Sequence, residues 1–168
     1  MGKIVIGVVG PGAAATEQDR ENAFQLGRGI GAAGWVVLTG GMAVGVMDAA
    51  LQGANSVGGL TVGMLPHAHR HGAAKAIDLA ILTDLGSARN NVLVLSSQVV
   101  VACGMSLGTA SEVALALKAQ RPVVLLGVSP LTAQFFQQWD DGLLTIATGP
   151  AETITAIGKL FAGRDANG

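Results

Sequence analysis

Short runs of apolar residues alternate along the chain with longer, helix-length segments. The apolar runs are continuous, without intervening polar residues, which is typical of strands buried on both faces of a sheet. The predicted strands are Ile4–Val9, Trp35–Leu38, Leu60–Leu65, Asp78–Thr83, Val99–Cys103, Val123–Leu126 and Leu143–Ala147. The predicted helices are Thr16–Gly34, with Thr16 as its cap, Val44–Ser56, Ala88–Ser97, Thr109–Gln120, Leu131–Gln138 and Ala151–Phe161.

This order of elements predicts an α/β fold, namely a doubly wound, mainly parallel sheet with helices on both faces, of the Rossmann-like kind. No internal repeat or linker divides the chain, so we expect one domain over residues 1–163 and a disordered tail at residues 164–168. In such sheets a ligand binds outside the carboxyl ends of the strands, where the strand order reverses. The turns that follow the strands are therefore the first places to search for a site.

Composition excludes several classes of protein. Of the 168 residues, 50% are hydrophobic and 12% are charged, which excludes intrinsic disorder. The net charge of -1 excludes a strongly basic nucleic-acid binder, and the single cysteine excludes a disulfide framework or a zinc site made only of cysteines. No apolar run reaches the roughly 18 residues that a membrane span needs.

The low charge, together with a mean hydropathy of +0.52, favours a symmetric homodimer or homotetramer, since an oligomer buries part of a weakly charged surface. The alternative is a monomer whose surface consists mostly of Ala, Gly, Ser, Thr and Gln. The segment Met1–Ala15 has the outline of a secretory signal peptide, but Gly10-Pro11-Gly12 interrupts it. A first β-strand explains it better, and we expect a cytoplasmic protein.

The first turn, Gly7–Gly12, departs from the dinucleotide fingerprint G-x-G-x-x-G, and Thr39 stands where an acidic residue would hold a ribose. These departures disfavour NAD, and the absence of G-x-x-x-x-G-K-[ST] excludes a P-loop nucleotide. The second turn contains Thr39, Gly40, Gly41 and Gly45. Its glycines would let the backbone approach an anion at the next helix N-terminus, although a tight strand-to-helix turn explains them equally well.

The third turn runs from Gly104 to a helix expected to start at Gly108-Thr109. Thr109 and Glu112 have the spacing of a capping box, Thr-x-x-Glu, in which Glu112 would only satisfy a helix amide. The functional interpretation places this carboxylate beside a phosphate-binding helix start, where it could bind ribose hydroxyls or stabilise a positively charged centre. Arg89 can face the same cleft and bind phosphate bidentately, or can be a structural ion-pair partner.

These segments resemble the LOG-like superfamily, also called lysine decarboxylase-like or SLOG. The resemblance rests on Gly-Gly-x-x-x-Gly-x-Met at Gly40–Met47, on Arg89, and on Gly-x-x-x-Gly-Thr-x-x-Glu at Gly104–Glu112, and it extends from Lys3 to about Gly127. The superfamily includes cytokinin-activating phosphoribohydrolases. The longer matches Thr-Gly-Gly-x-x-x-Gly-Val-Met-Asp-Ala-Ala, Gly-Ser-Ala-Arg-Asn-Asn and Ala-Cys-Gly-Met-x-x-Gly-Thr-Ala-Ser-Glu are similar to the molybdenum cofactor carrier proteins.

The resemblance implies a non-catalytic carrier or store for molybdenum cofactor, which would be bound as cargo. The implied binding residues are Gly10, Pro11, Gly12, Thr39, Gly40, Gly41, Gly45, Arg89, Asn90, Gly104, Met105, Ser106, Gly108, Thr109 and Glu112. The alternative is a nucleoside 5′-monophosphate phosphoribohydrolase, with Arg89 and Glu112 acting on the N-glycosidic bond. A third class is a ligand sensor that acts through its oligomer interface.

Three departures from the phosphoribohydrolase pattern favour the carrier. Cys103-Gly104-Met105 replaces Pro-Gly-Gly, Asn90 stands where a lysine usually follows the arginine, and Met42 stands where a third glycine usually follows the paired ones. The cargo is an anionic pterin with a dithiolene-bound metal and a terminal phosphate. Glycine backbone, two helix N-termini and Arg89 would bind its phosphate and oxo groups, with Asn90, Asn91 and Ser106 as neutral donors.

No metal-ligating residues are expected. Cys103 is interpreted as a small core residue, and His67, His69 and His71 as a surface loop that could edge the cleft. Trp35 and Trp139 are assigned to core or interface packing. The expected partners are the small anionic ligand, further copies of the chain, and a molybdoenzyme or a cofactor-synthesis protein, with no nucleic acid and no membrane.

Overall fold

The computed structural model describes residues 2–162, and it shows strands and helices alternating along the chain. The strands are β1 (Val5–Val9), β2 (Val36–Thr39), β3 (Thr61–Leu65), β4 (Leu79–Leu82), β5 (Val99–Cys103), β6 (Val123–Leu126) and β7 (Leu144–Ala147). The helices are α1 (Glu17–Ala32), α2 (Gly45–Asn55), α3 (Arg89–Ser96), α4 (Leu107–Lys118), α5 (Pro130–Gln137) and α6 (Pro150–Ala162), and a single 3-10 turn, η1 (Gly86–Ala88), precedes α3.

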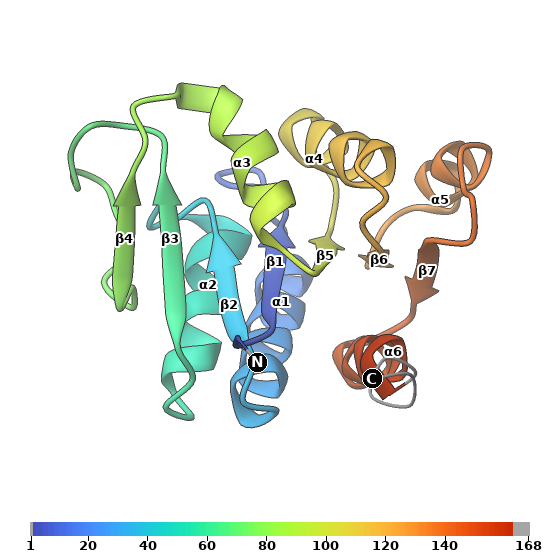
Figure 1. The fold of residues 1–168 in the computed structure, drawn as a ribbon, viewed down its shortest axis with the longest axis horizontal. Coiled ribbons are helices and arrows are strands. Elements are labelled where there is room, and N and C mark those ends of the chain that lie inside the picture. Colours follow the sequence, from blue (N-terminus) through green and yellow to red (C-terminus); the bar gives the residue numbers. More distant parts are fainter. Residues whose placement is uncertain (1, 163–168) are drawn as a thin grey trace.

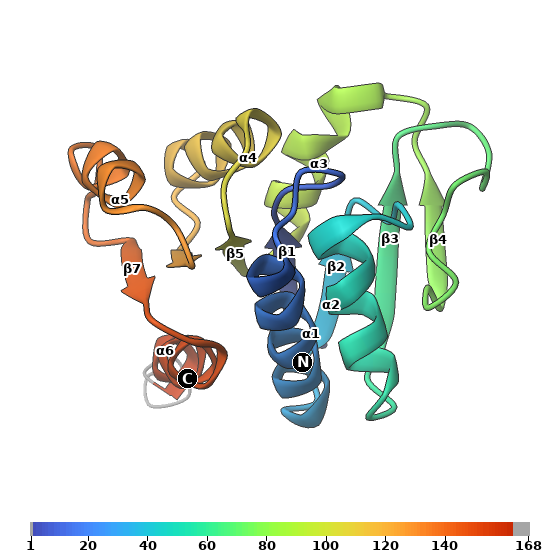
Figure 2. The same ribbon diagram turned by 180° about the vertical axis from the view of Figure 1, so that it is seen from behind.

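The seven strands form one sheet in the order β4-β3-β2-β1-β5-β6-β7, and every neighbouring pair is parallel. Helices α1, α2 and α6 lie on one face and α3, α4 and α5 on the other (Figures 1 and 2). This arrangement confirms the predicted doubly wound α/β fold. The sheet is more regular than the prediction required, since all of its pairs are parallel rather than most of them.

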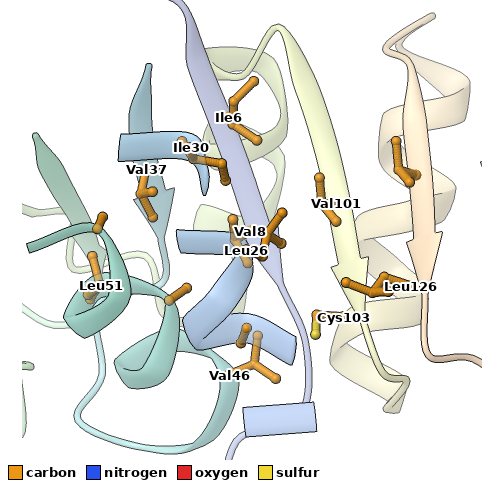
Figure 3. Close-up of a cluster of buried hydrophobic side chains, with 14 of the residues drawn as sticks. Ile6, Val8, Leu26, Ile30, Val37, Val46, Leu51, Val101, Cys103 and Leu126 are labelled. Carbon is orange, nitrogen blue, oxygen red and sulfur yellow. The ribbon is translucent and has the colours of Figure 1, made fainter. Parts of the chain in front are cut away.

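The core lies on both faces of the central strands, as the continuous apolar runs predicted. Figure 3 shows one side of it, where Ile6 and Val8 of β1 pack with Leu26 and Ile30 of α1, and all four are fully buried. Truncation of such a side chain to alanine typically costs about 2–5 kcal/mol. This packing holds β1 rigidly, which fixes the position of the turn that follows it.

The predicted helices and strands all occur, with ends shifted by a few residues. Thr16 caps α1 as predicted, in a reciprocal capping box with Asp19. The predicted capping box of Thr109 with Glu112 is wrong. The cap of α4 is Ser106, whose hydroxyl accepts a hydrogen bond from the amide of Thr109, so the helix starts at Leu107 and Glu112 has no capping role.

The two tryptophans differ in their surroundings. Trp35 packs against the core, and its ring lies 5.9 Å from that of Phe161, between ring centroids. Trp139 is exposed just after α5, so its predicted alternative as a core residue is wrong. Its other predicted role, in packing at an interface, stays a prediction. The tail predicted at residues 164–168 lies outside the described residues. Among residues 2–162, no helix has the length and apolar character needed to cross a bilayer.

Candidate functional site

The strand order reverses between β1 and β5, the two neighbours at the centre of the sheet. From β1 the chain passes through α1 to β2 on one side, and from β5 it passes through α4 to β6 on the other. In open α/β sheets, the crevice at the carboxyl ends of two such strands is where ligands bind. The turns that start at Gly10 and Gly104 flank this crevice.

A cavity of about 240 Å³ lies there. It is lined by nine of the residues that the sequence predicted, namely Gly10, Gly12, Gly40, Arg89, Asn90, Ser106, Gly108, Thr109 and Glu112. Four further residues line it that the sequence did not single out as binding residues, namely Val8, Val9, Met47 and Ser87. Met47 and Ser87 lie inside the quoted motifs, so their places in those motifs were the available signal.

Arg89 is the only positively charged residue that lines the cavity. Its Nη1 atom donates a 2.7 Å hydrogen bond to Oδ1 of Asn90, whereas its Nε atom is buried and has no hydrogen-bond partner among residues 2–162. The protein thus uses only part of the hydrogen-bonding capacity of this guanidinium, and the residue lines the cavity as a cation.

Asn90 connects Arg89 to the start of α4. Its Nδ2 atom donates to the hydroxyl of Ser111 at 3.2 Å, and that hydroxyl donates to the carbonyl oxygen of Gly108 at 2.6 Å. Asn90 is itself buried. This chain of hydrogen bonds fixes the guanidinium relative to the α4 N-terminus, so that both present donors to the same cavity.

The start of α4 supplies a partial positive charge to the cavity. The hydroxyl of Ser106 accepts from the amide of Thr109 at 3.2 Å and lies 2.9 Å from the hydroxyl of Thr109. One of the first amides of the helix is thereby satisfied from within the protein. Gly108, one position earlier, lines the cavity, and its amide has no partner within the helix.

Glu112 lies in the same cavity, one turn into α4. It is only 8% exposed, and no hydrogen bond or ion pair holds its carboxyl group within the described residues. Burial raises the pKa of Glu112 from its ordinary value of 4.5 to about 7, and the attraction of Arg89 opposes that rise. Burial also lowers the pKa of Arg89, while Glu112 raises it. Both groups thus lose solvation where they face one another.

Six predicted binding residues do not line the cavity. They are Pro11, Thr39, Gly41, Gly45, Gly104 and Met105. Their roles in the structure are local. The hydroxyl of Thr39 accepts from the amide of Gly41, and Met105 packs between α4 and α5.

The start of α2, the second helix start expected at the cleft, contributes Met47 alone to the cavity lining. The amide of Val46, in the first turn of α2, donates to the carbonyl oxygen of Pro11 at 3.0 Å, so it is already satisfied. Gly45 packs against the turn after β1, where a side chain would overlap Pro11 and Gly12. The second wall is instead made by the start of α3, which brings Arg89 and Asn90.

Cys103 is fully buried at the end of β5, as the sequence interpretation required. Its thiol donates to the carbonyl oxygen of Asp19 at 3.4 Å. Burial, with a smaller effect of Asp19, raises the pKa of this thiol to about 12. Because only the thiolate is a good metal ligand, Cys103 has the properties of a core residue.

The histidine loop leads from β3 to β4. His67, His69 and His71 are exposed, with ring centroids 5.1 Å and 6.2 Å apart in sequence order. The loop pairs with the turn after β2, since the amide of Ala43 donates to Gly72 and that of Ala74 donates to Gly41. No group of three His, Cys, Asp or Glu side chains within residues 2–162 is arranged to hold a metal ion.

A larger groove of about 1070 Å³ runs between α1 and α2. Its walls carry the carboxylates of Glu17, Glu21 and Asp48 against the single guanidinium of Arg20, which already donates to the carbonyl oxygen of Ala15. An acidic wall repels an anion. The smaller cavity at the strand reversal is therefore the better candidate for an anionic ligand.

Comparison with known proteins gives consistent matches over most of the chain. A model of the SLOG cluster4 family matches residues 3–154. An uncharacterized protein of Archaeoglobus fulgidus is 40% identical over 121 residues, which are 72% of this chain and 78% of that protein.

Solved structures give similar matches. The molybdenum cofactor binding protein from the phototrophic bacterium Rippkaea orientalis is 51% identical, with a TM-score of 0.93, over 96% of this chain and 99% of that one. The molybdenum cofactor carrier protein from Chlamydomonas reinhardtii is 49% identical, with a TM-score of 0.90, over 95% of this chain and 99% of that one.

Proposed function

The chain belongs to the SLOG cluster4 family, and from this premise we propose that it carries or stores molybdenum cofactor as a bound, anionic cargo. The family membership agrees with the resemblance to the LOG-like superfamily. The two solved structures described above are of proteins that bind or carry this cofactor, and each is about half identical to this chain. The proposal includes a cytoplasmic location. It also includes transfer of the cofactor from a cofactor-synthesis protein to a molybdoenzyme.

The single observation that carries the proposal is the guanidinium of Arg89, the only cation among the residues that line the cavity. It lines a cavity whose other donors come from the start of α4 and from Asn90. A guanidinium combined with a helix N-terminus is a general means of binding phosphate or oxo groups. The 240 Å³ cavity is smaller than the roughly 300–1,000 Å³ of pockets that enclose a whole drug-sized ligand, so it would hold one anionic end of the cargo.

Retention of the cargo tests the proposal directly. The purified protein is mixed with molybdenum cofactor without oxygen and passed through gel filtration, and molybdenum per chain is measured. The proposal expects stoichiometric retention by the wild type and strong loss in Arg89→Ala. Arg28→Ala is the matched control, because Arg28 is an exposed arginine of α1 outside the cavity. Absence of metal from the wild type would end the carrier proposal.

The phosphoribohydrolase alternative is supported by one observation. Glu112 has a pKa of about 7 and lies in the same cavity as Arg89, and a carboxyl group of that pKa is suited to proton transfer near neutral pH. Incubation with a panel of nucleoside 5′-monophosphates, followed by chromatography for free base, tests this alternative. Release of base by the wild type and its loss in Glu112→Gln would establish the enzyme.

We also propose that the chain forms a homo-oligomer through the outer face of α4 and α5. This face exposes Leu107, Leu131, Phe135 and Trp139, at 93%, 76%, 53% and 69% of their surface. Lys118 is the only exposed charged side chain on α3, α4 and α5. From side-chain sizes the four residues present on the order of 500 Å² of apolar surface, and a patch of that size is often an interaction site.

The proposed occupant of that face is a second copy of this chain. A stable interface buries about 800 Å² on each partner, and most of that area is already present as apolar side chains here. The two helices of this face carry one exposed charge, Lys118, and a second copy with the same apolar side chains complements it. Light scattering after gel filtration measures the mass of the assembly.

A further inference from the structure

Glu112 presents an apparent contradiction at the proposed site. Its carboxyl group lines a cavity whose other features attract anions. A carboxylate and an anionic ligand in the same 240 Å³ space repel each other at close range, and the low polarisability of a buried site strengthens the repulsion. The two negative groups can therefore share the cavity only if one of them is neutralised.

The protein offers little positive charge to neutralise both groups. Arg89 on α3 is the only cation among the lining residues, and Glu112 on α4 is the only acid. The turns after β1, β2 and β5 bring glycine and serine, and α2 brings the uncharged Met47. A phosphate monoester carries about −1.5 to −2 charges at neutral pH. One guanidinium falls short of balancing this ligand and an ionised Glu112 together.

No contact within the described residues commits Glu112 to either protonation state. Its carboxyl group receives no hydrogen bond from a backbone amide, and no ion pair joins it to Arg89. Its carboxyl oxygens are not among the fully buried polar atoms that lack partners, so they open onto the cavity. A protonated carboxyl group in that position has a donor O–H directed into the ligand space.

We propose that binding of the anionic cargo is coupled to uptake of one proton from solvent, which Glu112 holds as a neutral carboxylic acid that donates its O–H to an oxygen of the ligand. This inference rests on the proposed anion-binding function of the same cavity. No covalent bond of the ligand changes, and the proton returns to solvent when the cargo leaves.

The coupling predicts a pH dependence with a definite sign. In the free protein the pKa of Glu112 is about 7, so near neutral pH about half of the chains must gain a proton to bind. Above that pKa the affinity falls by up to tenfold for each unit of pH, because one proton is taken up per ligand. Below it the affinity is independent of this group. A rise in pH would thus favour release of the cargo.

Titration calorimetry with sulfate tests the coupling, because the charge of sulfate does not change near neutral pH. The experiment uses the whole chain at about pH 8, in two buffers that differ in their heat of ionisation, which gives the number of protons taken up on binding. The expected result is close to one proton per sulfate in the wild type. Glu112→Gln should bind sulfate with no proton uptake and with an affinity that is independent of pH. Glu152→Gln, an exposed glutamate of α6, is the matched control and should behave as the wild type.

Two results would overturn the inference. The first is sulfate binding by the wild type without proton uptake, and this measurement needs no variant to fold. The second is an absence of sulfate binding, because the cavity would then not hold a dianion beside Glu112. The proposed carrier function fails on a separate observation, namely the absence of molybdenum cofactor from the wild type after gel filtration. Infrared difference spectra give an independent readout, since a protonated carboxyl signal should appear on binding and be absent in Glu112→Gln.

Discussion

Gly40 and Arg89 lie so close together that a Cβ atom at position 40 would come within 2.6 Å of Nη2 of Arg89. The glycine after β2 therefore serves the site by making room for the guanidinium, although its own backbone was expected to approach the ligand. The Sδ atom of Met47 would lie 2.8 Å from the same Cβ atom. The guanidinium is thus held between the turn after β2, the helix α2 and Asn90.

Substitution of Gly40 by alanine should displace Arg89 and weaken retention of the cargo. Loss of a charge-assisted hydrogen bond corresponds to roughly tenfold or more in affinity. Gly149→Ala is the matched control, because a Cβ atom there meets no neighbour within 4 Å. The two variants are compared at a protein concentration too low to bind all of the cofactor, so that a weaker affinity appears as less retained molybdenum. Equal retention by both variants would show that Arg89 does not need this space.

Asn90→Ala should reduce the affinity for sulfate because Arg89 loses its support, and not only because Asn90 loses a contact with the anion. The substitution removes the acceptor of the Arg89 Nη1 hydrogen bond and the link to Ser111. In a double-mutant cycle, Asn90→Ala should weaken sulfate binding several-fold in the wild type and much less in Arg89→Ala. Strictly additive effects would mean that the two residues act independently.

Glu112→Gln should stabilise the folded chain at high pH. The folded-state pKa of Glu112, about 7, lies above its ordinary value of 4.5, so the folded chain retains a proton that the unfolded chain has already released. The resulting loss of stability is absent below pH 4.5, grows as the pH rises to about 7, and is then constant at about 3 kcal/mol. Urea unfolding of both proteins at about pH 5 and about pH 8 measures the difference, which should grow with pH. A difference that does not depend on pH would contradict the raised pKa.

Leu131→Glu should reduce the mass of the assembly without unfolding the chain. The side chain is 76% exposed in the single chain, so a charge there disturbs only the proposed contact with a second copy. Val57→Glu, at an exposed apolar position next to α2, is the control and should leave the mass unchanged. An unchanged mass for Leu131→Glu in light scattering would exclude this face as the interface.

Cys103→Ala should retain molybdenum as the wild type does. The thiol is buried, and its pKa of about 12 keeps it protonated at neutral pH. The folded wild type should also react slowly with thiol reagents, and denaturant should accelerate the reaction. Loss of molybdenum from an alanine variant that unfolds in urea as the wild type does would contradict the assignment of Cys103 to the core alone.

The strands and helices were predictable because their signals are local. Continuous apolar runs such as Val99–Cys103 identify buried parallel strands, and Ser, Thr and Gly residues delimit the helices between them. The exact start of α4 was not predictable from spacing, since Ser106 and Thr109 are both suitable caps and the backbone selects between them.

The candidate site was predictable in part, for a related reason. The turns after β1 and β5 and the start of α3 meet because of the strand order, and the predicted doubly wound sheet already directed the search to the turns after the strands. The direction of each side chain within a turn depends on tertiary packing. Met105 lies next to Ser106 in sequence but packs between α4 and α5, whereas Ser87, whose only signal was its place in a quoted motif, borders the cavity.

A crystal structure of the protein loaded with molybdenum cofactor without oxygen tests the central claim most directly. The account predicts an anionic oxygen of the cargo about 3 Å from a guanidinium nitrogen of Arg89, within the cavity between the turn after β1 and the start of α4. Cargo bound in the groove between α1 and α2, with no cargo oxygen near the guanidinium of Arg89, would contradict it.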